Sequence, residues 1–576
     1  MKYFLGIDIG GSWIKAISIK HTGSFDPMKI AQTCISAKIY RIQSGLSIDT
    51  SWQEFTHTLD ALIDSMDIDP KCIAGIGVST AGIVNYHGSE LTLCAPHLVV
   101  LKSVEWIEYL RNKTKAPVML INDADAATIG ASALGYLRGN RCYGVMPIGT
   151  GLGFTVIRNS RRWTPNFSLT LLGSLYTPVG GYDAIASASL LEKQSDKQQL
   201  NLIFTDPKYA DVKETYLHNL AGIIASAHIV YGTDEILLGG GFADAAVQYG
   251  YGQDIEEYLE KILQEHGALT SKSTKVAILR EGNLLPLIGA VLLSLGESKA
   301  QLLRKAPIYT DIKTESAYDS TLHLDKMDTG SILGLLSRVE QESCYELNKT
   351  IPQLTKVVDL VTERLKQGGR LIYVGCGTSG RLAAVDTVEI ACTFGFPRDK
   401  VLTLISGGVA DAAIDIESRF EEDASSVPEL LMASITSKDV IVGISVSGTA
   451  YYVQSALGLG KSLGALSVLI QEKDVETLPF CDYILPLHSG SEVIAGSTRM
   501  KAGTATKKIA NFLSTAVMIK LGKVHGTYMT ELECINEKLI KRAVSILESL
   551  LKIDKTEALA LLKKHKFRLN DVLRDC

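Results

Sequence analysis

Short apolar segments that end in glycine-rich or hydroxyl-rich turns recur along most of the chain. Each segment has the length and the branched side chains of a buried strand, and helical patterns separate most of them. Strand–helix alternation of this kind predicts parallel sheets covered by helices, which is an α/β fold. The alternation forms two blocks, and the polar stretch 297–325 between them suits a connector.

Composition narrows the class of protein further. The 576 residues allow about three to five domains. A hydrophobic fraction of 46% excludes a mainly disordered chain, and fifty glycines against fifteen prolines favour tight turns over proline-rich linkers. The net charge of −5 provides no broad basic field, so we do not expect nucleic acid as a partner.

The first apolar run, the longest apolar stretch and the cysteines indicate the cellular compartment of the protein. Asp8 interrupts the first apolar run, so no signal peptide is expected. The stretch 284–295 is too short to span a bilayer and contains Pro286, so we expect no membrane partner. The ten cysteines include no C-x-x-C pair and no zinc-spaced cluster. We therefore expect reduced thiols in a cytoplasmic protein without a structural metal.

The first block begins with a glycine-rich turn, 6–12, between the predicted strands 3–9 and 14–19. Such a turn lets backbone N–H groups approach a phosphate closely, and Asp8 could hold the Mg²⁺ that accompanies ATP. A plain hairpin explains this turn equally well. Three further turns each follow a predicted strand, and together the four favour phosphate binding. These three turns are 122–127, which opens a helix that Asn122 could simply cap, 149–153 and 239–241.

These motifs, in this order, resemble those of the ROK family of sugar kinases over about residues 1–297. The resemblance implies a two-lobed fold of the ribonuclease H-like, actin-like ATPase type, with ATP and Mg²⁺ as cofactors. It makes Asp123 the general base for a sugar 6-hydroxyl, Asn122 a sugar contact and Asp8 the metal ligand. The implied nucleotide-binding residues are Asp8, Gly10, Gly11, Ser12, Gly149, Thr150, Gly151, Gly153, Gly239, Gly240 and Gly241.

The first block also departs from the ROK pattern. The family's Glu-x-Gly-His sugar motif falls near 172–174, where neither Glu nor His is present, and its cysteine-rich zinc motif is missing. Two interpretations stay open: the sugar differs from glucose, for example by a bulkier group near C3, or the kinase activity is lost.

The second block opens with a G-x-G-x-x-G turn, 375–380, behind the predicted strand 370–374. A dinucleotide site expects an acidic residue at the end of the next strand, but 401–405 ends in Ser406, Gly407 and Gly408. Thr378 and Ser379 at the start of a helix suit a phosphomonoester instead.

Two further polar segments follow in this block. Ser445, Ser447 and Thr449 form a second hydroxyl-rich loop behind strand 440–444, where a parallel sheet binds ligands. The third segment, 491–504, adds hydroxyls, an acid and cations. For both segments, the alternative to ligand binding is that these residues only cap helices. The predicted substrate-binding residues of this third segment are Glu492, Ser497, Thr498 and Lys501.

The second block, from about Thr314 to the end, resembles the N-acetylmuramic acid 6-phosphate etherases, whose core is a sugar isomerase (SIS) domain. The resemblance implies cleavage of a D-lactyl ether without a cofactor, and a homodimer with sites at the subunit interface. Glu389 falls on the catalytic acid/base position and Glu422 on the second functional position, with Glu421 as an alternative. For this chemistry we expect Glu389 to be buried, with a raised pKa.

The etherase pattern is altered at two places: the run 447–451 lacks the family's Arg-Thr-Pro, and 390–392 lacks its Pro-Pro. We expect a kinase domain over 1–297, a connector over 298–313, a doubly wound SIS domain over 314–525 and a helical tail over 526–576. The fusion would catalyse two consecutive steps on one amino sugar. The alternatives are a regulator of the glucokinase regulatory protein type, which senses a sugar phosphate, and an isomerase.

Overall fold

The computed structural model divides the chain into two compact units. Unit 1 combines Met1–Leu302 with Ala424–Ile435, and unit 2 combines Leu303–Asp423 with Thr436–Cys576. The described residues are 2–21, 23–85, 90–94, 96–137, 139, 141–159, 161–162, 176–177, 180–194, 200–266, 274–301, 313–408, 425–475, 481–531, 534 and 536–575.

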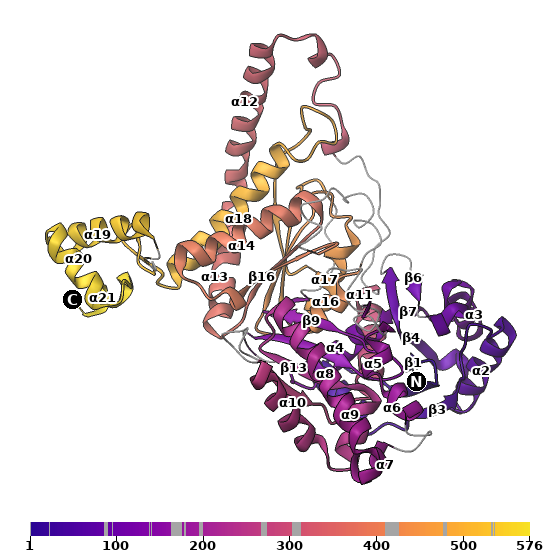
Figure 1. Ribbon diagram of the computed structural model, residues 1–576. Helices are drawn as coiled ribbons and strands as arrows, with labels where there is room; N and C mark the ends of the chain where they lie inside the picture. Colours follow the sequence, from indigo (N-terminus) through magenta and orange to yellow (C-terminus); the bar gives the residue numbers. More distant parts are fainter. Residues whose placement is uncertain are drawn as a thin grey trace. The chain divides into compact units, whose positions relative to one another are not determined.

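Unit 1 contains two five-stranded sheets with the same plan (Figure 1). In each, antiparallel hairpin strands continue into parallel strands, as expected for the two lobes of the actin-like fold. The first sheet has the order β3 (Tyr40–Gln43), β2 (Trp13–Lys20), β1 (Tyr3–Ile9), β4 (Ile73–Thr80) and β7 (Val118–Asn122). The second has the order β10 (Arg161–Arg162), β9 (Thr155–Arg158), β8 (Cys142–Pro147), β13 (Glu235–Gly239) and β14 (Lys275–Ile278).

Helices cover both sheets. One face of the first sheet packs against α2 (Trp52–Asp64) and α3 (Glu105–Thr114), and the second sheet packs against α8 (Ala210–Tyr231), α9 (Gly240–Gln248) and α10 (Gly252–His266). The other named elements of the unit are short. They are α1 (Pro27–Ile35), β5 (Gly82–Asn85), β6 (Glu90–Cys94), β11 (Tyr176–Thr177), β12 (Gly180–Gly181), α5 (Asp183–Ala186), α6 (Ala188–Gln194) and α7 (Leu200–Thr205).

Two further helices, α4 (Asp123–Ala133) and α11 (Leu285–Gln301), lie so close together that glycine is required between them. A Cβ at Gly289 would overlap the Ala126 carbonyl of α4, and one at Gly77 of β4 would overlap the Ala290 carbonyl of α11. The close packing holds α11 against β4 and against the helix that carries Asp123.

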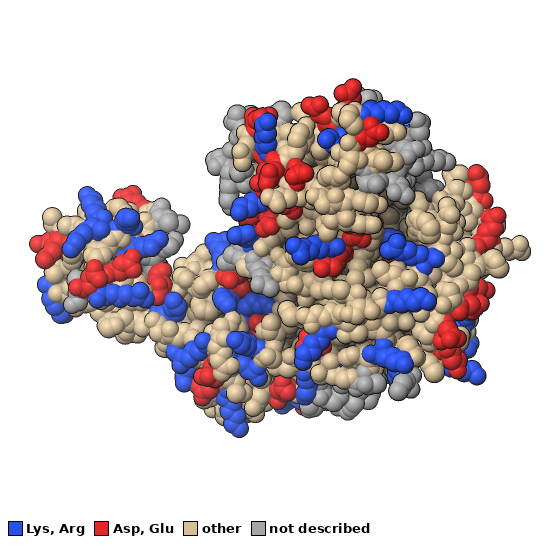
Figure 2. Space-filling view, turned by 90° about the horizontal axis from the view of Figure 1, so that it is seen from below, with Lys and Arg blue, Asp and Glu red and all other residues tan. Residues whose placement is uncertain are grey.

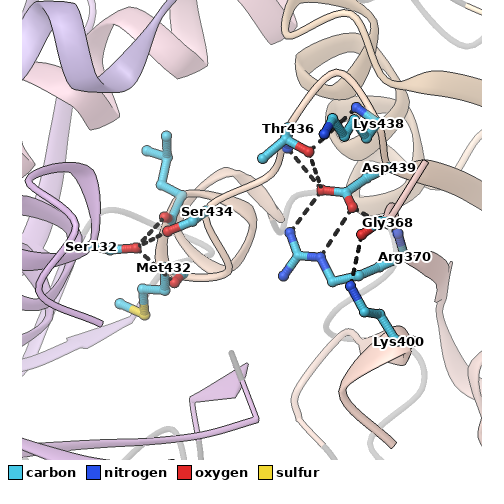
Figure 3. Close-up of polar contacts among 10 residues, drawn as sticks. Ser132, Gly368, Arg370, Lys400, Met432, Ser434, Thr436, Lys438 and Asp439 are labelled. Atoms are coloured by element: carbon cyan, nitrogen blue, oxygen red, sulfur yellow. Dashed lines mark hydrogen bonds and ion pairs between the residues drawn. The ribbon is translucent and has the colours of Figure 1, made fainter. Parts of the chain in front are cut away.

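Unit 1 also includes a short segment from the second half of the sequence. Helix α16 (Val427–Met432) is buried along almost its whole length and packs against α4, α11 and β10. The Ser132 hydroxyl, near the end of α4, lies 3.0 Å from the Met432 carbonyl oxygen and also pairs with the Ser434 hydroxyl (Figure 3). The expected domain division did not include this insertion.

Unit 2 is built on a five-stranded, wholly parallel sheet, as the alternation of the second block predicted. Its order places the first strand next to the third, which is a doubly wound arrangement. The strands in spatial order are β16 (Val401–Ile405), β15 (Leu371–Gly375), β17 (Val440–Ile444), β18 (Leu466–Gln471) and β19 (Tyr483–Pro486).

Alternate residues of these strands pack against different helices, as the two-residue period of a strand requires. Val442 and Ile444 contact a core formed with α13 (Ile351–Lys366), α14 (Gly377–Phe394) and α18 (Lys501–Lys520), whereas Gly443 faces α17 (Tyr451–Ser462). The ion pair of Arg370 with the buried Asp439, 2.8 Å apart, fixes the start of β15 beside β17 (Figure 3).

Several elements differ from the expected boundaries for local reasons. The helical stretch 331–367 is two helices, α12 (Thr329–Glu346) and α13, because Pro352 cannot continue a helix from a preceding turn.

The end of the chain has its own apolar core and a hairpin, rather than being only a tail. Its elements are β20 (Val524–His525), β21 (Tyr528–Met529), α19 (Glu537–Leu551), α20 (Lys555–Lys564) and α21 (Leu569–Asp575).

The surface matches the modest net charge. Basic and acidic side chains intermingle on the face that Figure 2 shows. Among the described residues, no helix is both long enough and apolar enough to cross a membrane.

Candidate active sites

The carboxylate of Asp8 lies at the end of β1 in unit 1, where the phosphate turn begins. Its Oδ1 accepts a hydrogen bond from the Ser79 hydroxyl at 3.0 Å, and its Oδ2 lies 3.8 Å from the Lys15 Nζ. Burial raises the pKa of Asp8, and Lys15 and Ser79 oppose that shift. The structure thus gives this acid the position that the sequence predicted, with a cation beside it.

Lys15 belongs to a network that the sequence did not reveal. Its Nζ donates to the Asn283 Oδ1 at 2.8 Å, and the Asn283 backbone N–H donates to the Asp244 Oδ2 at 3.1 Å. The network joins β2, α9 and the turn before α11, which are far apart in sequence. Lys15 is the residue of β2 that pairs with Asp8 of β1. In the sequence, only the alternation of side chains along this strand could have indicated that Lys15 lies beside Asp8.

The helix that begins behind β7 carries the predicted base, Asp123. Asn122 caps this helix: its Oδ1 accepts from the N–H groups of Ala124 and Asp125, and its Nδ2 donates to the Gly82 carbonyl. Asn122 is only 1% exposed. The structure therefore shows the capping role, and the sugar contact stays a prediction.

Asp123 has the electrostatic setting of a base. Burial and the carboxylates of Asp8, Asp125 and Asp183 raise its pKa to about 7, although a hydrogen bond from the Ala124 N–H lowers the pKa. A general base is most effective when its pKa lies near the working pH. Asp183, which sequence reasoning missed, accepts from the Leu152 N–H at 2.6 Å and so lies beside the second glycine turn.

Asp125, two residues further along α4, forms a buried ion pair. Its carboxylate binds the Arg162 guanidinium at 2.9 Å and accepts from the Thr155 hydroxyl at 2.8 Å. Both charged side chains are at most 7% exposed. This pair fixes α4 against β9 and β10. Among the described residues, Asp123 has no such ion pair.

The three glycine turns of unit 1 differ in how tightly they are built. Gly240 has φ 78°, and a Cβ there would overlap the Ile148 carbonyl, so only glycine fits. Ser12 and Thr150 are exposed at the tips of the first and second turns. The remaining predicted residues of these turns, Gly10, Gly11, Gly149, Gly151, Gly153, Gly239 and Gly241, lie within them or at their ends.

In unit 2, the G-x-G-x-x-G turn places a helix start at the carboxyl end of β15. Gly375 and Gly380 approach so closely that a Cβ at Gly375 would lie 2.7 Å from the Gly380 nitrogen. Thr378 and Ser379 occupy the first turn of α14 and are partly exposed. Their hydroxyls and the backbone N–H groups of the helix start can bind a phosphate together.

The second hydroxyl loop follows β17, which is the neighbour of β15. Because Gly375 pairs with Ile444, Ser445 begins next to the first loop. The Ser447 and Thr449 hydroxyls are 2.7 Å apart, and Gly448 has φ 70° between them. The sheet therefore brings the two predicted phosphate loops to one edge.

The third segment has a strong structural role. Glu492 is fully buried, and its carboxylate accepts from the N–H groups of Lys501 and Ala502 at the start of α18. The Lys501 Nζ donates to the Ser489 carbonyl at 2.9 Å. Burial raises the pKa of Glu492, and these hydrogen bonds oppose the shift. Ser497 and Thr498 are partly exposed in the turn before α18.

The predicted catalytic residue Glu389 is not buried, which corrects our expectation. It lies on the outer face of α14 with its side chain 56% exposed, and its Oε2 is 2.8 Å from the Lys507 Nζ of α18. It is exposed because α14 packs on the sheet through its other face, on which Ala383, Asp386 and Ile390 are buried. Glu421, Glu422 and the region 172–174 lie outside the described residues.

Two family models match the chain, one in each half. The model described as the ROK family matches residues 4–167, and the one described as the glucokinase regulatory protein N-terminal SIS domain matches residues 353–461.

Curated relatives match the second half of the chain, which spans most of their length. N-acetylmuramic acid 6-phosphate etherase from Mycoplasma mycoides is 38% identical over 241 residues, which are 42% of this chain and 80% of the relative. The etherase from Prochlorococcus marinus (strain NATL2A) is 40% identical over 256 residues, 44% of this chain and 82% of the relative.

Solved structures of ROK proteins align with about half of the chain. A ROK family glucokinase from Streptomyces griseus, in complex with glucose and AMPPNP, is 17% identical with a TM-score of 0.40, over 51% of this chain and 99% of that one. The ROK hexokinase from Thermus thermophilus is 19% identical with a TM-score of 0.36, over 52% and 99%.

Proposed function

The chain belongs to the N-acetylmuramic acid 6-phosphate etherase family through its C-terminal half, and we propose that this half cleaves the D-lactyl ether of that sugar phosphate. We further propose that the ROK-type N-terminal half transfers phosphate from ATP to O6 of N-acetylmuramic acid. The product of the first reaction is then the substrate of the second. The supporting observation is that one chain joins an N-terminal match to the ROK family model with a C-terminal half that belongs to the etherase family.

In the etherase half, the two hydroxyl loops hold the 6-phosphate and Glu389 acts on the sugar. In the open-chain sugar, the C2 proton is acidic because C1 is a carbonyl. The Glu389 carboxylate takes this proton, the C3–O bond breaks, and lactate leaves with a proton returned by Glu389. Water then adds across the C2–C3 double bond and supplies the C3 hydroxyl and the C2 hydrogen. The products are N-acetylglucosamine 6-phosphate and D-lactate.

In the kinase half, Asp123 accepts the proton of the sugar 6-hydroxyl as that oxygen attacks the γ-phosphate of ATP. The bond between the γ-phosphorus and the bridging oxygen breaks, and ADP leaves. Phosphoryl transfer needs little further covalent help once the groups are positioned. The glycine turns offer backbone N–H groups to the phosphates, and Lys15 adds a positive charge beside Asp8. The absence of the Glu-x-Gly-His motif suits a sugar that carries a large substituent at C3.

The residues present fit a Mg²⁺ ion that arrives with ATP. Mg²⁺ usually binds through one or two carboxylates together with substrate phosphates. Asp8 supplies such a carboxylate, which remains 14% exposed at the end of β1. When bound, the ion would neutralise charge on the phosphates.

The coupled reaction tests the proposal directly. Purified protein is incubated with N-acetylmuramic acid, Mg²⁺ and ATP, and D-lactate is measured. Lactate release is expected, and it should cease when ATP is omitted. A second reaction uses N-acetylmuramic acid 6-phosphate as the substrate. Lactate release from the 6-phosphate, but none from N-acetylmuramic acid with ATP, contradicts the kinase half of the proposal. Release from neither substrate contradicts the etherase half.

We also propose a homodimer formed through the SIS domain. Val385 and Val388 lie beside Glu389 on α14 and are 45% and 62% exposed. A second copy seated on this face would bury both valines and shield Glu389 from water. Light scattering should give twice the chain mass, and Val388→Lys should reduce it to a single chain.

A regulatory protein is the second candidate, favoured by the match of 353–461 to the glucokinase regulatory protein model. Glu389→Gln separates the two functions. We expect lactate release to fall by about 10²–10⁴-fold, because a positioned acid/base contributes that much to a rate. Binding of the sugar phosphate, measured by calorimetry, should persist. A variant that retains wild-type lactate release would favour the regulator.

A further inference from the structure

A lysine that sequence reasoning did not single out stands between two acids of α14. The Nζ of Lys507, on α18, is 2.8 Å from the Glu389 Oε2 and 3.9 Å from the Asp386 Oδ1. The lysine side chain is 24% exposed, less than half the exposure of its partner Glu389. One ammonium group therefore lies beside an exposed and a buried carboxylate that are three residues apart on α14.

The inner carboxylate is held rigidly. Asp386 is 2% exposed, its Oδ2 accepts from the Tyr373 hydroxyl at 2.9 Å, and its Oδ1 accepts from the Ser514 hydroxyl at 3.1 Å. Burial raises the pKa of Asp386, and Lys507 opposes that shift. Tyr373 comes from β15 and Ser514 from α18, so this acid is anchored by the sheet and by a second helix.

We propose that Lys507 is a positioning residue for the etherase reaction, anchored by Asp386 so that its ammonium group holds the Glu389 carboxylate in the correct orientation. The inference rests on the proposed etherase function. The groups that face the pair are Asp386 on the same helix, Tyr373 beneath it and the Ser514 hydroxyl. Among these described neighbours, Lys507 is the cation.

The role follows from what Glu389 must do in each half of the cycle. Glu389 must be ionised to take the C2 proton, and a cation at hydrogen-bond distance favours the ionised form. After transfer the carboxyl group is neutral, so its attraction to Lys507 weakens and the proton can pass to the departing lactate oxygen. The arrangement lets one carboxyl group act first as base and then as acid.

The test is the pH dependence of lactate release from N-acetylmuramic acid 6-phosphate. In Lys507→Met, we expect the midpoint on the acidic side of the kcat/KM profile to move to higher pH by about one unit or more. At pH values well below both midpoints, kcat/KM should fall by about tenfold for each unit of this shift. Lys507→Arg keeps the charge and should retain most of the wild-type profile. The matched control is Lys520→Ala. Lys520 is on α18, like Lys507, and its exposed side chain pairs with Asp359 of α13.

A second variant separates positioning from folding. Lys507→Met leaves the buried Asp386 without its cation, whereas Lys507→Met with Asp386→Asn removes both charges. The double variant should fold, as circular dichroism will show, and still have the shifted profile. A wild-type profile in either folded variant overturns the inference. If the wild-type protein releases no lactate at all, the proposed function fails instead.

Discussion

Asp123 and Asp125 are two residues apart on α4, yet their surroundings give them opposite roles. Asp125 is neutralised by the buried Arg162 guanidinium and therefore fixes structure. Asp123 has carboxylates as neighbours, and its pKa rises to about 7. A buried charge without an adjacent cation costs stability, and an acid that titrates near neutrality suits proton transfer. At this scale, charge pairing decides which acid is available for chemistry.

Asp123→Asn should abolish the kinase reaction and stabilise unit 1. The folded pKa of about 7 lies above the ordinary value of 3.8. Between these values the folded chain holds a proton that the unfolded chain has released, so stability falls as the pH rises and the penalty is complete above pH 7. Asparagine avoids this penalty.

We therefore expect the gain from Asp123→Asn to be larger at pH 8 than at pH 5, by about 1–3 kcal/mol. Urea unfolding of both proteins at the two pH values measures it. Equal pH responses in wild type and variant would contradict the raised pKa.

At the scale of elements, the closest packing in unit 1 is the contact of α11 with α4 and β4. Backbone meets backbone there, and glycines at the contact make this approach sterically allowed. Since α4 carries Asp123 at its first position, the packing of α11 against α4 also sets the position of Asp123. The periodicity of α11 predicts a buried helix, but it does not show which of its glycines faces a carbonyl.

Gly289→Ala should force α11 away from α4, because the added Cβ would overlap the Ala126 carbonyl. Overpacking of this kind costs about 1–3 kcal/mol, and the kinase rate should fall with it. Gly222→Ala in α8 is the matched control, since no atom lies within 4 Å of the Cβ position. That change should be neutral or slightly stabilising. Thermal unfolding of the two variants measures the contrast, and equal effects would contradict the packing argument.

At the scale of the whole molecule, the kinase unit is completed by residues from the etherase half of the sequence. In the sequence, segment 424–435 lies between β16 and β17. Both of these strands belong to unit 2, but the segment itself is part of unit 1. Leu430 of α16 is fully buried, and Ser132 at the end of α4 binds the Met432 carbonyl. Unit 1 therefore depends on a segment that follows Leu302, the end of its main part, by more than a hundred residues.

Leu430→Ala should consequently destabilise the kinase unit although it lies in the etherase half. A buried leucine truncated to alanine costs about 2–5 kcal/mol. Hydrogen exchange of the full chain should show faster exchange in α4, with α19 unchanged. Leu333→Ala, at a position 61% exposed, is the control. Unchanged exchange in α4 would contradict the assignment of α16 to unit 1.

The strands and their turns were predictable because their signals are local. The positions of β1, β4, β13, β15, β16 and β17 follow from short apolar runs that end in glycine or serine. The candidate loops were predictable for the same reason, since a glycine turn behind a strand is visible in sequence. The role of Lys507 was not predictable, because a lysine on a helix face is ordinary until its partners are known.

The sequence by itself determined the two α/β blocks, the order of their turns and the residue types offered to phosphate, since these depend on periodicity and on backbone freedom at glycine. Only the tertiary structure decided that Asp125 is paired with Arg162, that Asp123 is buried near other carboxylates, that Glu389 faces outward beside Lys507, and that α16 belongs to unit 1. Each of these depends on distances between segments far apart in the chain. Burial and charge pairing, which set the pKa of an acid, exist only once those segments are packed together.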